Sequence, residues 1–317
     1  MLARLQQAMT LGLAALALGW AVVAWQQGHP AWMPVGALLV LGVYAAFMAL
    51  EFVLVAWVHR DDPAPRASAG QLLRAWWGEV TTAPGVFCWR QPFRWDAVPD
   101  VPGRPGQRGI VFVHGFVCNR GLWTPWLRRL QAQGRPFVAV NLEPVFGSIE
   151  AYADTIDAAV RTLEQRTGLP PVLVCHSMGG LAARAWLRRF QADARVHRVI
   201  TIGTPHHGTW LGRFGQMPNT RQMRLRSDWV EALAREEPPS RYTHFTCFYG
   251  HCDNIVFPAS TATLPGADNR HIEGTAHVHM AFHPAVWDEA MRWLDAELQT
   301  ARMASPGSNS PASSVGS

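Results

Sequence analysis

The sequence contains no lysine, so all of its 28 basic residues are arginines, and with 23 acidic residues the formal net charge is +5. The arginines are scattered among acidic and apolar residues. They form no basic patch with interleaved aromatic residues, which is the pattern of nucleic-acid binding surfaces. We therefore expect no nucleic-acid partner.

Cysteine is also scarce: there are five, none in a C-x-x-C pair, namely Cys88, Cys118, Cys175, Cys247 and Cys252. An odd number argues against a complete disulfide framework, and this usage favours a reducing compartment. No residue spacing is typical of a calcium or zinc site. We expect no metal and no cofactor.

Two long apolar runs lie near the N-terminus, at residues 9–25 and 35–58. The second is long enough to cross a bilayer and the first is marginally so. Tryptophans lie near their ends, as at membrane interfaces. We predict a transmembrane hairpin in residues 1–60, with a signal-peptide core preceded by Arg4 as the alternative for the first run.

Flanking arginines predict the orientation of this hairpin. The connecting loop has none, whereas basic residues precede the first run and follow the second: Arg4, Arg60, Arg66 and Arg74. The positive-inside rule then places both ends, and the large C-terminal part, in the cytoplasm. If only one run spans, that part lies on the other side. Glu51 is the one charged residue of the second run. We favour the interpretation that the membrane span ends near Leu50, over one in which Glu51 bonds a polar group inside the membrane.

Residues 61–108 are expected to form a linker and a flap. Residues 61–70 are charged and rich in proline and alanine, as in a linker. Residues 71–80 fit a short amphipathic helix. The aromatic stretch 86–95 fits an edge strand or a flap on the membrane surface.

From residue 109 short apolar runs alternate with amphipathic helical patterns. This is typical of an α/β fold with a doubly wound, mostly parallel sheet. We expect one such domain over residues 109–302, with a small cap at about 205–240, and a disordered tail at 303–317. The expected strands are 109–113, 136–140, 172–175, 196–202, 242–249 and 270–273, and the expected helices are 122–133, 148–166, 180–190 and 284–298.

The third strand runs into Cys175-His176-Ser177-Met178-Gly179-Gly180, and a helical pattern follows at once. A serine between small residues on such a turn is typical of a nucleophile elbow. Small residues let the strand and helix pack closely, although Cys175 stands where this motif has glycine. The alternative is a glycine-containing turn with an incidental serine. Ser177 is the candidate nucleophile.

A serine nucleophile needs donors for the oxyanion, a base, and an acid that orients the base. As donors we choose the backbone N–H groups of Phe116, after the first strand, and Met178; the alternative is a plain turn in which His114 packs. As acid we choose Asp253, and as base His277 after Gly274. The rivals are Asp268 and Glu273 for the acid, and His206, His207, His279 and His283 for the base.

These residues make the region 109–298 resemble the α/β-hydrolase superfamily, specifically its bacterial lipase/esterase branch of triacylglycerol-lipase type. The order Ser, Asp, His along the chain is the one this superfamily uses. The segments that carry the resemblance are Val113-His114-Gly115-Phe116, the elbow itself, Thr201-Ile202-Gly203-Thr204-Pro205-His206-His207-Gly208-Thr209, Asp253 with Val256, and residues 274–277.

The resemblance implies a role for each candidate. Ser177 is the nucleophile, Asp253 orients the base His277, and Phe116 and Met178 supply the oxyanion hole. His206 and Gly208 shape the floor of the site without being catalytic. The implied reaction is acyl transfer to Ser177 followed by hydrolysis of a carboxylic ester, lipid-like or acylglycerol.

The apolar runs have no counterpart in secreted lipases. With the resemblance, they imply a multi-pass protein of the bacterial inner membrane, whose partners are the bilayer and a membrane lipid or small ester substrate. Two other functions stay open: an acyltransferase that uses the same three residues, and a non-catalytic hydrolase fold that serves as a membrane-tethered binding module. An Asp-nucleophile dehalogenase or epoxide hydrolase is disfavoured because the elbow carries serine.

Overall fold

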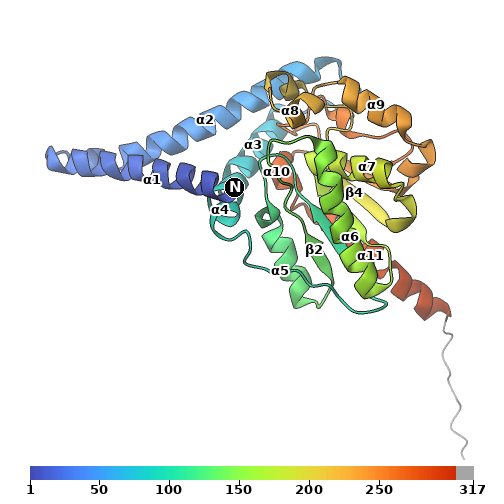
Figure 1. Ribbon diagram of the computed structural model, residues 1–317. Helices are drawn as coiled ribbons and strands as arrows, with labels where there is room; N and C mark the ends of the chain where they lie inside the picture. Colours follow the sequence, from blue (N-terminus) through green and yellow to red (C-terminus); the bar gives the residue numbers. More distant parts are fainter. Residues whose placement is uncertain (305–317) are drawn as a thin grey trace, which may run out of the picture.

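The computed structural model describes residues 1–304, and a six-stranded sheet lies at its centre (Figure 1). The strand order is β2-β1-β3-β4-β5-β6, and every neighbouring pair is parallel. This confirms the predicted fold class. The strands are β1 Ile110–Val113, β2 Phe137–Ala139, β3 Val172–His176, β4 Arg198–Ile202, β5 Phe245–Tyr249 and β6 Asp268–His271.

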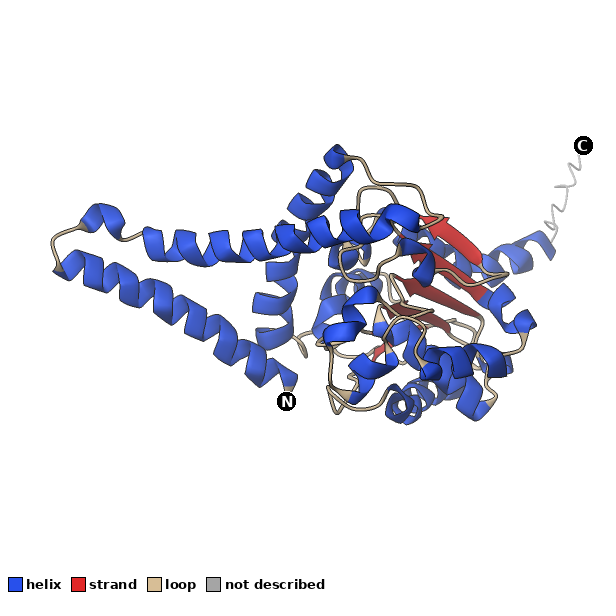
Figure 2. Ribbon diagram, turned by 90° about the horizontal axis from the view of Figure 1, so that it is seen from above, coloured by secondary structure: helices blue, strands red, loops and turns tan. Residues whose placement is uncertain are grey.

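Helices cover both faces of the sheet (Figure 2). Alternate strand residues such as Val111 and Leu173 pack with the helices α6 Ala153–Thr167 and α7 Met178–Phe190. The residues between them, such as Phe112 and Val174, pack with α5 Thr124–Ala132 and α11 Pro284–Ala304. Because both faces are buried, β1 is apolar at every position rather than at every second one.

A short helical region lies between β4 and β5, where the cap is expected. It contains the 3₁₀ turn η7 Trp210–Phe214 and the helices α8 Pro218–Gln222 and α9 Asp228–Glu236. A fully buried ion pair joins it to α7: the Arg184 guanidinium of that helix lies 2.6 Å from a carboxylate oxygen of Glu237, which follows α9. The Tyr242 hydroxyl donates to the same carboxylate at 2.6 Å.

Two helices at the N-terminus, α1 Leu2–Gln26 and α2 Val35–Val58, project from the domain as a hairpin (Figures 1 and 2). Both are long and apolar enough to cross a membrane. Helix α3 Ala69–Pro84 follows and crosses the open end of the hairpin (Figure 2). It begins inside the predicted linker because Ser68 and Gln71 form a capping box there.

The expectation of a strand at 86–95 is wrong. The chain continues α3 through a π-helical turn, η3 Gly85–Arg90, into α4 Gln91–Phe93. The Gln91 side chain is fully buried and accepts a 2.9 Å hydrogen bond from Gln6 of α1. Because this segment is helical, it packs against α1. The predicted tail begins at residue 303. Residues 303 and 304 form the end of α11, and residues 305–317 lie outside the described residues.

Candidate active site

Ser177 stands between the end of β3 and the first residue of α7. Its backbone has φ 55° and ψ −128°, a conformation that non-glycine residues adopt only under constraint. The constraint is visible: the Ser177 N–H donates to Ile202 O at 2.8 Å, and the Thr204 hydroxyl donates to Ser177 O at 2.9 Å. The turn therefore has the sharp geometry expected of an elbow.

The glycines after Ser177 allow this turn to pack closely. A Cβ on Gly179 would lie 2.5 Å from the Val113 carbonyl oxygen, and one on Gly180 would lie 2.3 Å from the Thr204 hydroxyl oxygen. Cys175, which replaces a glycine of the motif, is fully buried within β3 and pairs with Val113 and Thr201 of the neighbouring strands. Its side chain is accommodated inside the sheet packing.

Asp253 and His277 are in direct contact. One Asp253 carboxylate oxygen lies 2.9 Å from His277 Nδ1, and the other accepts from the backbone N–H groups of Ile255 at 2.9 Å and Val256 at 2.8 Å. Burial lowers the pKa of His277, but the charge and hydrogen bond of Asp253 outweigh it, so the pKa lies above its ordinary value. The carboxylate fixes both the orientation and the basicity of the imidazole.

Ser177 and His277 line one cavity of about 280 Å³, together with Phe116. A Cβ on Gly115 would lie 2.7 Å from Ser177 Cβ, so the loop after β1 lies against the candidate nucleophile. Met178 is the first residue of α7, where backbone N–H groups have no acceptor within the helix. The structure thus brings the five predicted site residues to one end of the sheet, with Asp253 behind His277.

Two further histidines are buried beside this arrangement. His114 Nε2 accepts from Leu142 N–H at 3.0 Å, and its Nδ1 lies 2.9 Å from Gly115 O; burial lowers its pKa to about 4. It therefore fixes the loop that carries Phe116. The His176 ring packs against the His277 ring at a tilt of 47°, with ring centroids 4.5 Å apart, and burial lowers the pKa of His176 well below its ordinary value.

The N-terminal helices complete the site. Glu79 of α3 is buried and accepts from the backbone N–H groups of Val278 and His279, both at 3.0 Å. Glu51 of α2 accepts from the Asn254 side chain at 2.6 Å. Glu51 therefore has a polar partner in the loop that follows β5. Glu79 and Asn254 were missed because nothing in their local sequence distinguishes them.

The rival residues have other partners. Asp268 pairs with Arg270 at 2.6 Å in β6, and Glu273 is exposed. His206 is buried against Thr201 at 3.1 Å and, like Gly208, is not among the residues that line the cavity. His207 lines a separate cavity.

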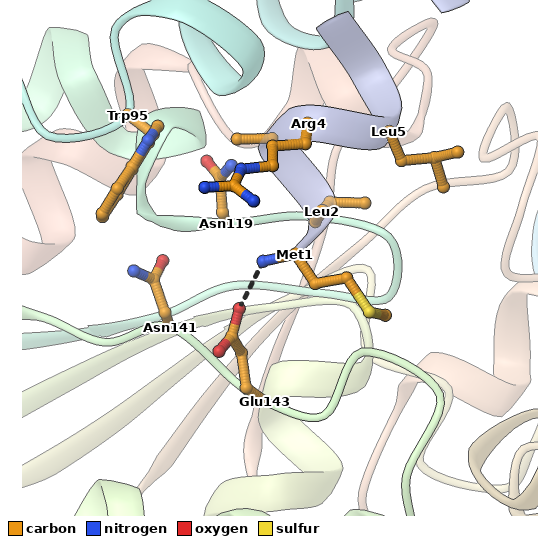
Figure 3. A pocket seen from close by; sticks show the side chains of 9 residues that line it. Met1, Leu2, Arg4, Leu5, Trp95, Asn119, Asn141 and Glu143 are labelled. Atoms are coloured by element: carbon orange, nitrogen blue, oxygen red, sulfur yellow. Dashed lines mark hydrogen bonds and ion pairs between the residues drawn. The ribbon is translucent and has the colours of Figure 1, made fainter. Parts of the chain in front are cut away.

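A larger cavity of about 780 Å³ lies where the start of α1 meets the loops after β1 and β2 (Figure 3). There the Met1 amino group lies 3.2 Å from a Glu143 carboxylate oxygen. The lining residues Trp95, Asn119 and Asn141 include no candidate nucleophile or base, so we place the active site at the smaller cavity. Within residues 1–304, no group of three or more His, Cys, Asp and Glu side chains is placed to hold a metal ion.

Comparisons with known proteins agree with this fold. The mature form of a lipase from Bacillus licheniformis is 20% identical over 61% of this chain and 94% of that chain, with a TM-score of 0.51. Lipase B of Aspergillus fumigatus is 19% identical over 60% of this chain and 52% of that chain, with a TM-score of 0.53. No curated protein matches the sequence. The model of the alpha/beta hydrolase family matches residues 110–311, and the chain therefore belongs to that family.

Proposed function

We propose that this protein is a serine hydrolase that cleaves carboxylic esters by acyl transfer to Ser177. The observation that carries the proposal is the 2.9 Å contact between Asp253 and His277 beside a cavity that the strained Ser177 also lines. A nucleophile, a base and an oriented carboxylate in this order form a recurrent acyl-transfer constellation.

The steps follow from these positions. His277 takes the hydroxyl proton as Ser177 Oγ attacks the ester carbonyl, and the N–H groups of Phe116 and Met178 stabilise the oxyanion. The C–O bond to the alcohol then breaks, and His277 returns the proton to the leaving oxygen. Water, deprotonated by His277, attacks the acyl-enzyme and releases the carboxylic acid and Ser177.

The cavity favours an apolar acyl chain. Apolar side chains from five parts of the chain line it: Met48, Ala83, Phe87, Phe116, Val117, Ile255 and Val278. Such a wall offers a hydrocarbon chain burial and offers a polar acyl group few partners.

We place this activity at a membrane. The α1–α2 hairpin anchors the protein in the bacterial inner membrane, and the positive-inside rule puts the domain in the cytoplasm. A test uses Gln27→Cys in the hairpin loop, in a Cys88→Ser background, and a membrane-impermeant maleimide. Labelling of intact cells supports this orientation, whereas labelling only after lysis overturns it.

Hydrolysis of p-nitrophenyl esters from acetyl to palmitoyl tests the reaction in detergent, with Ser177→Ala as the matched control. We expect the variant to lose at least about 10³-fold in kcat. We also expect a fluorophosphonate to label wild type and not the variant. If both proteins are equally inactive and neither is labelled, the chain is a membrane-tethered binding module instead. Transfer of the acyl group to an added alcohol in preference to water would make it an acyltransferase.

A further inference from the structure

An apolar groove of about 630 Å³ adjoins the cavity that holds Ser177. It lies between α1, α2 and η3, and it shares Tyr44, Ala83 and Phe87 with that cavity. The two spaces are therefore neighbours across these three side chains. Its volume is within the range of about 300–1,000 Å³ typical of ligand pockets.

The lining of the groove suits a hydrocarbon chain. It consists of aliphatic and aromatic side chains with only one hydroxyl and one thiol among them: Leu13, Leu39, Val40, Leu41, Val43, Tyr44, Phe47, Ala83, Pro84, Phe87 and Cys88. The Tyr44 hydroxyl lies 3.4 Å from Val80 O, which it takes as its acceptor. A polar ligand would lose its hydrogen bonds to water here, whereas an acyl chain would not.

The groove also lies where membrane hydrocarbon is expected. Helix α2 contacts α3 from Tyr44 and Ala45 onward, because the Trp76 indole donates to Ala45 O at 3.0 Å. The stretch 30–43 beyond these contacts measures roughly 20 Å, less than the ~30 Å hydrocarbon core of a bilayer. A hairpin that crosses the bilayer therefore places groove-lining residues of α2 beyond residue 43, such as Tyr44 and Phe47, within the hydrocarbon core.

Exposed apolar residues lie on the elements that form the groove. Leu39 and Leu41, which line it, are 56% and 60% exposed, and Trp77 of α3 and Trp89 of η3 are 61% and 58% exposed. Large apolar side chains exposed in this number mark a contact with membrane or protein. Their position on and beside a hairpin of membrane-spanning composition favours lipid.

We infer that this groove holds the acyl chain of a bilayer lipid ester, which enters sideways between α1 and α2 and reaches Ser177 past Tyr44, Ala83 and Phe87. This rests on the proposed function and names its substrate class. The acyl chain stays in an apolar environment throughout, so only the ester group must move toward Ser177 at the carboxyl end of β3.

The test narrows the groove at a position that the cavity of Ser177 does not share. Val40→Trp adds bulk to the groove wall, and Val53→Trp adds the same bulk at an exposed position of the same helix that lines neither space. The variants are reconstituted in phosphatidylethanolamine–phosphatidylglycerol vesicles. Each is assayed with a fluorogenic diacylglycerol analogue in the bilayer and with water-soluble p-nitrophenyl acetate.

We expect Val40→Trp to lose at least about tenfold on the bilayer ester and to keep acetate hydrolysis within about twofold, while Val53→Trp changes neither. Equal effects on both esters, or no effect on the bilayer ester, overturn the inference. Acetate hydrolysis that does not depend on Ser177 overturns the proposed function instead. The two failures are therefore distinguishable.

A second measurement guards against misfolding of Val40→Trp, and it uses the natural Cys88. This thiol lines the groove and is exposed, whereas the other four cysteines are buried. Addition of the thiol across the double bond of N-hexadecylmaleimide places a long chain in the groove. We expect loss of bilayer-ester hydrolysis, retention of acetate hydrolysis, and protection by Cys88→Ser. Unchanged bilayer-ester hydrolysis after complete labelling contradicts the inference.

Discussion

Glu51 and Asn254 join the N-terminal helical hairpin to the candidate base. The Asn254 Nδ2 group donates to Glu51 at 2.6 Å, and the Oδ1 atom of the same asparagine accepts from the His277 backbone N–H at 3.2 Å. Asn254 is fully buried and directly follows Asp253. One side chain of an apolar helix therefore stabilises the loop that carries Asp253 and the turn that carries His277.

Glu51→Leu is expected to lower kcat more than it raises KM. The variant leaves the buried Asn254 amide without its acceptor, which costs about 1–3 kcal/mol, or about 5- to 150-fold if fully expressed in the transition state. Glu51→Gln keeps an acceptor oxygen and is expected to retain most activity. Steady-state kinetics on p-nitrophenyl butyrate measure both. Equal loss in the two variants would show that the charge, not the hydrogen bond, is what matters.

Asp253→Asn is expected to reduce kcat by about 10⁴-fold, because an amide no longer holds the imidazole in the required tautomer. The Asp253 charge keeps the pKa of His277 above its ordinary value, so wild-type kcat/KM falls as pH drops through that raised pKa. In the variant this fall is expected at lower pH. Asp268→Asn, which weakens ion pairs with Arg270 and Arg198 away from His277, serves as the control and should leave the pH profile unchanged.

Glu79 is expected to make stability fall with rising pH. Burial, opposed by its two backbone hydrogen bonds, raises its pKa from 4.5 to about 7. Between these values the folded protein holds a proton that the unfolded chain has released, so the free energy of unfolding decreases as pH rises through the window. Glu79→Gln lacks this titration. The difference in Tm, wild type minus variant, should therefore be smaller at pH 8 than at pH 5, and a constant difference would refute the assignment.

Gly203→Ala is expected to disrupt the Asp253–His277 contact. At φ 53°, a Cβ on Gly203 would lie 2.7 Å from the Asp253 carboxylate and 3.0 Å from His277 Nδ1. Gly168→Ala is the matched control, since Gly168 has φ 71° and open space around its Cβ position. The left-handed backbone is expected to lower the free energy of unfolding of both variants by about 1–2 kcal/mol. Only Gly203→Ala should also lose most of its fluorophosphonate labelling rate.

The Arg184–Glu237 pair is expected to contribute to stability and not to chemistry. Replacing Glu237 by Gln leaves a fully buried guanidinium without its counter-charge, which costs about 3–5 kcal/mol. Asp154→Asn breaks the exposed pair with Arg189 and should cost about 0–1 kcal/mol. Thermal unfolding compares the two. At temperatures where both variants are folded, their kcat values should equal that of wild type.

The sheet and the elbow were predictable because their determinants are local. The run IVFV of β1 is apolar at every position, so it is stable as a strand only where both of its faces are buried. Ser177 and the glycines after it specify the turn within six residues. Asp253 and His277 were predictable only through their order along the chain. The structure places them in contact, whereas their catalytic role stays a prediction for the experiments above.

The N-terminal contribution to the site was not predictable from local patterns. Aromatic residues in 86–95 favour strands, but this segment is helical because it continues α3 and packs on α1. Glu79 has the sequence surroundings of a surface residue on an amphipathic helix. It is buried only because α3 folds back across the carboxyl ends of the strands, a long-range event that no short window records.

Helices α2 and α3 have a practical consequence for anyone preparing the enzyme. A chain shortened by 68 residues to avoid detergent would lose Tyr44, Met48 and Glu51 from the wall of the cavity. One shortened to the start of the sheet at residue 109 would also lose the acceptor of the Val278 and His279 amides. Such fragments would retain the family fold while presenting an uncovered active site, so their substrate preferences would describe the fragment and not the whole protein.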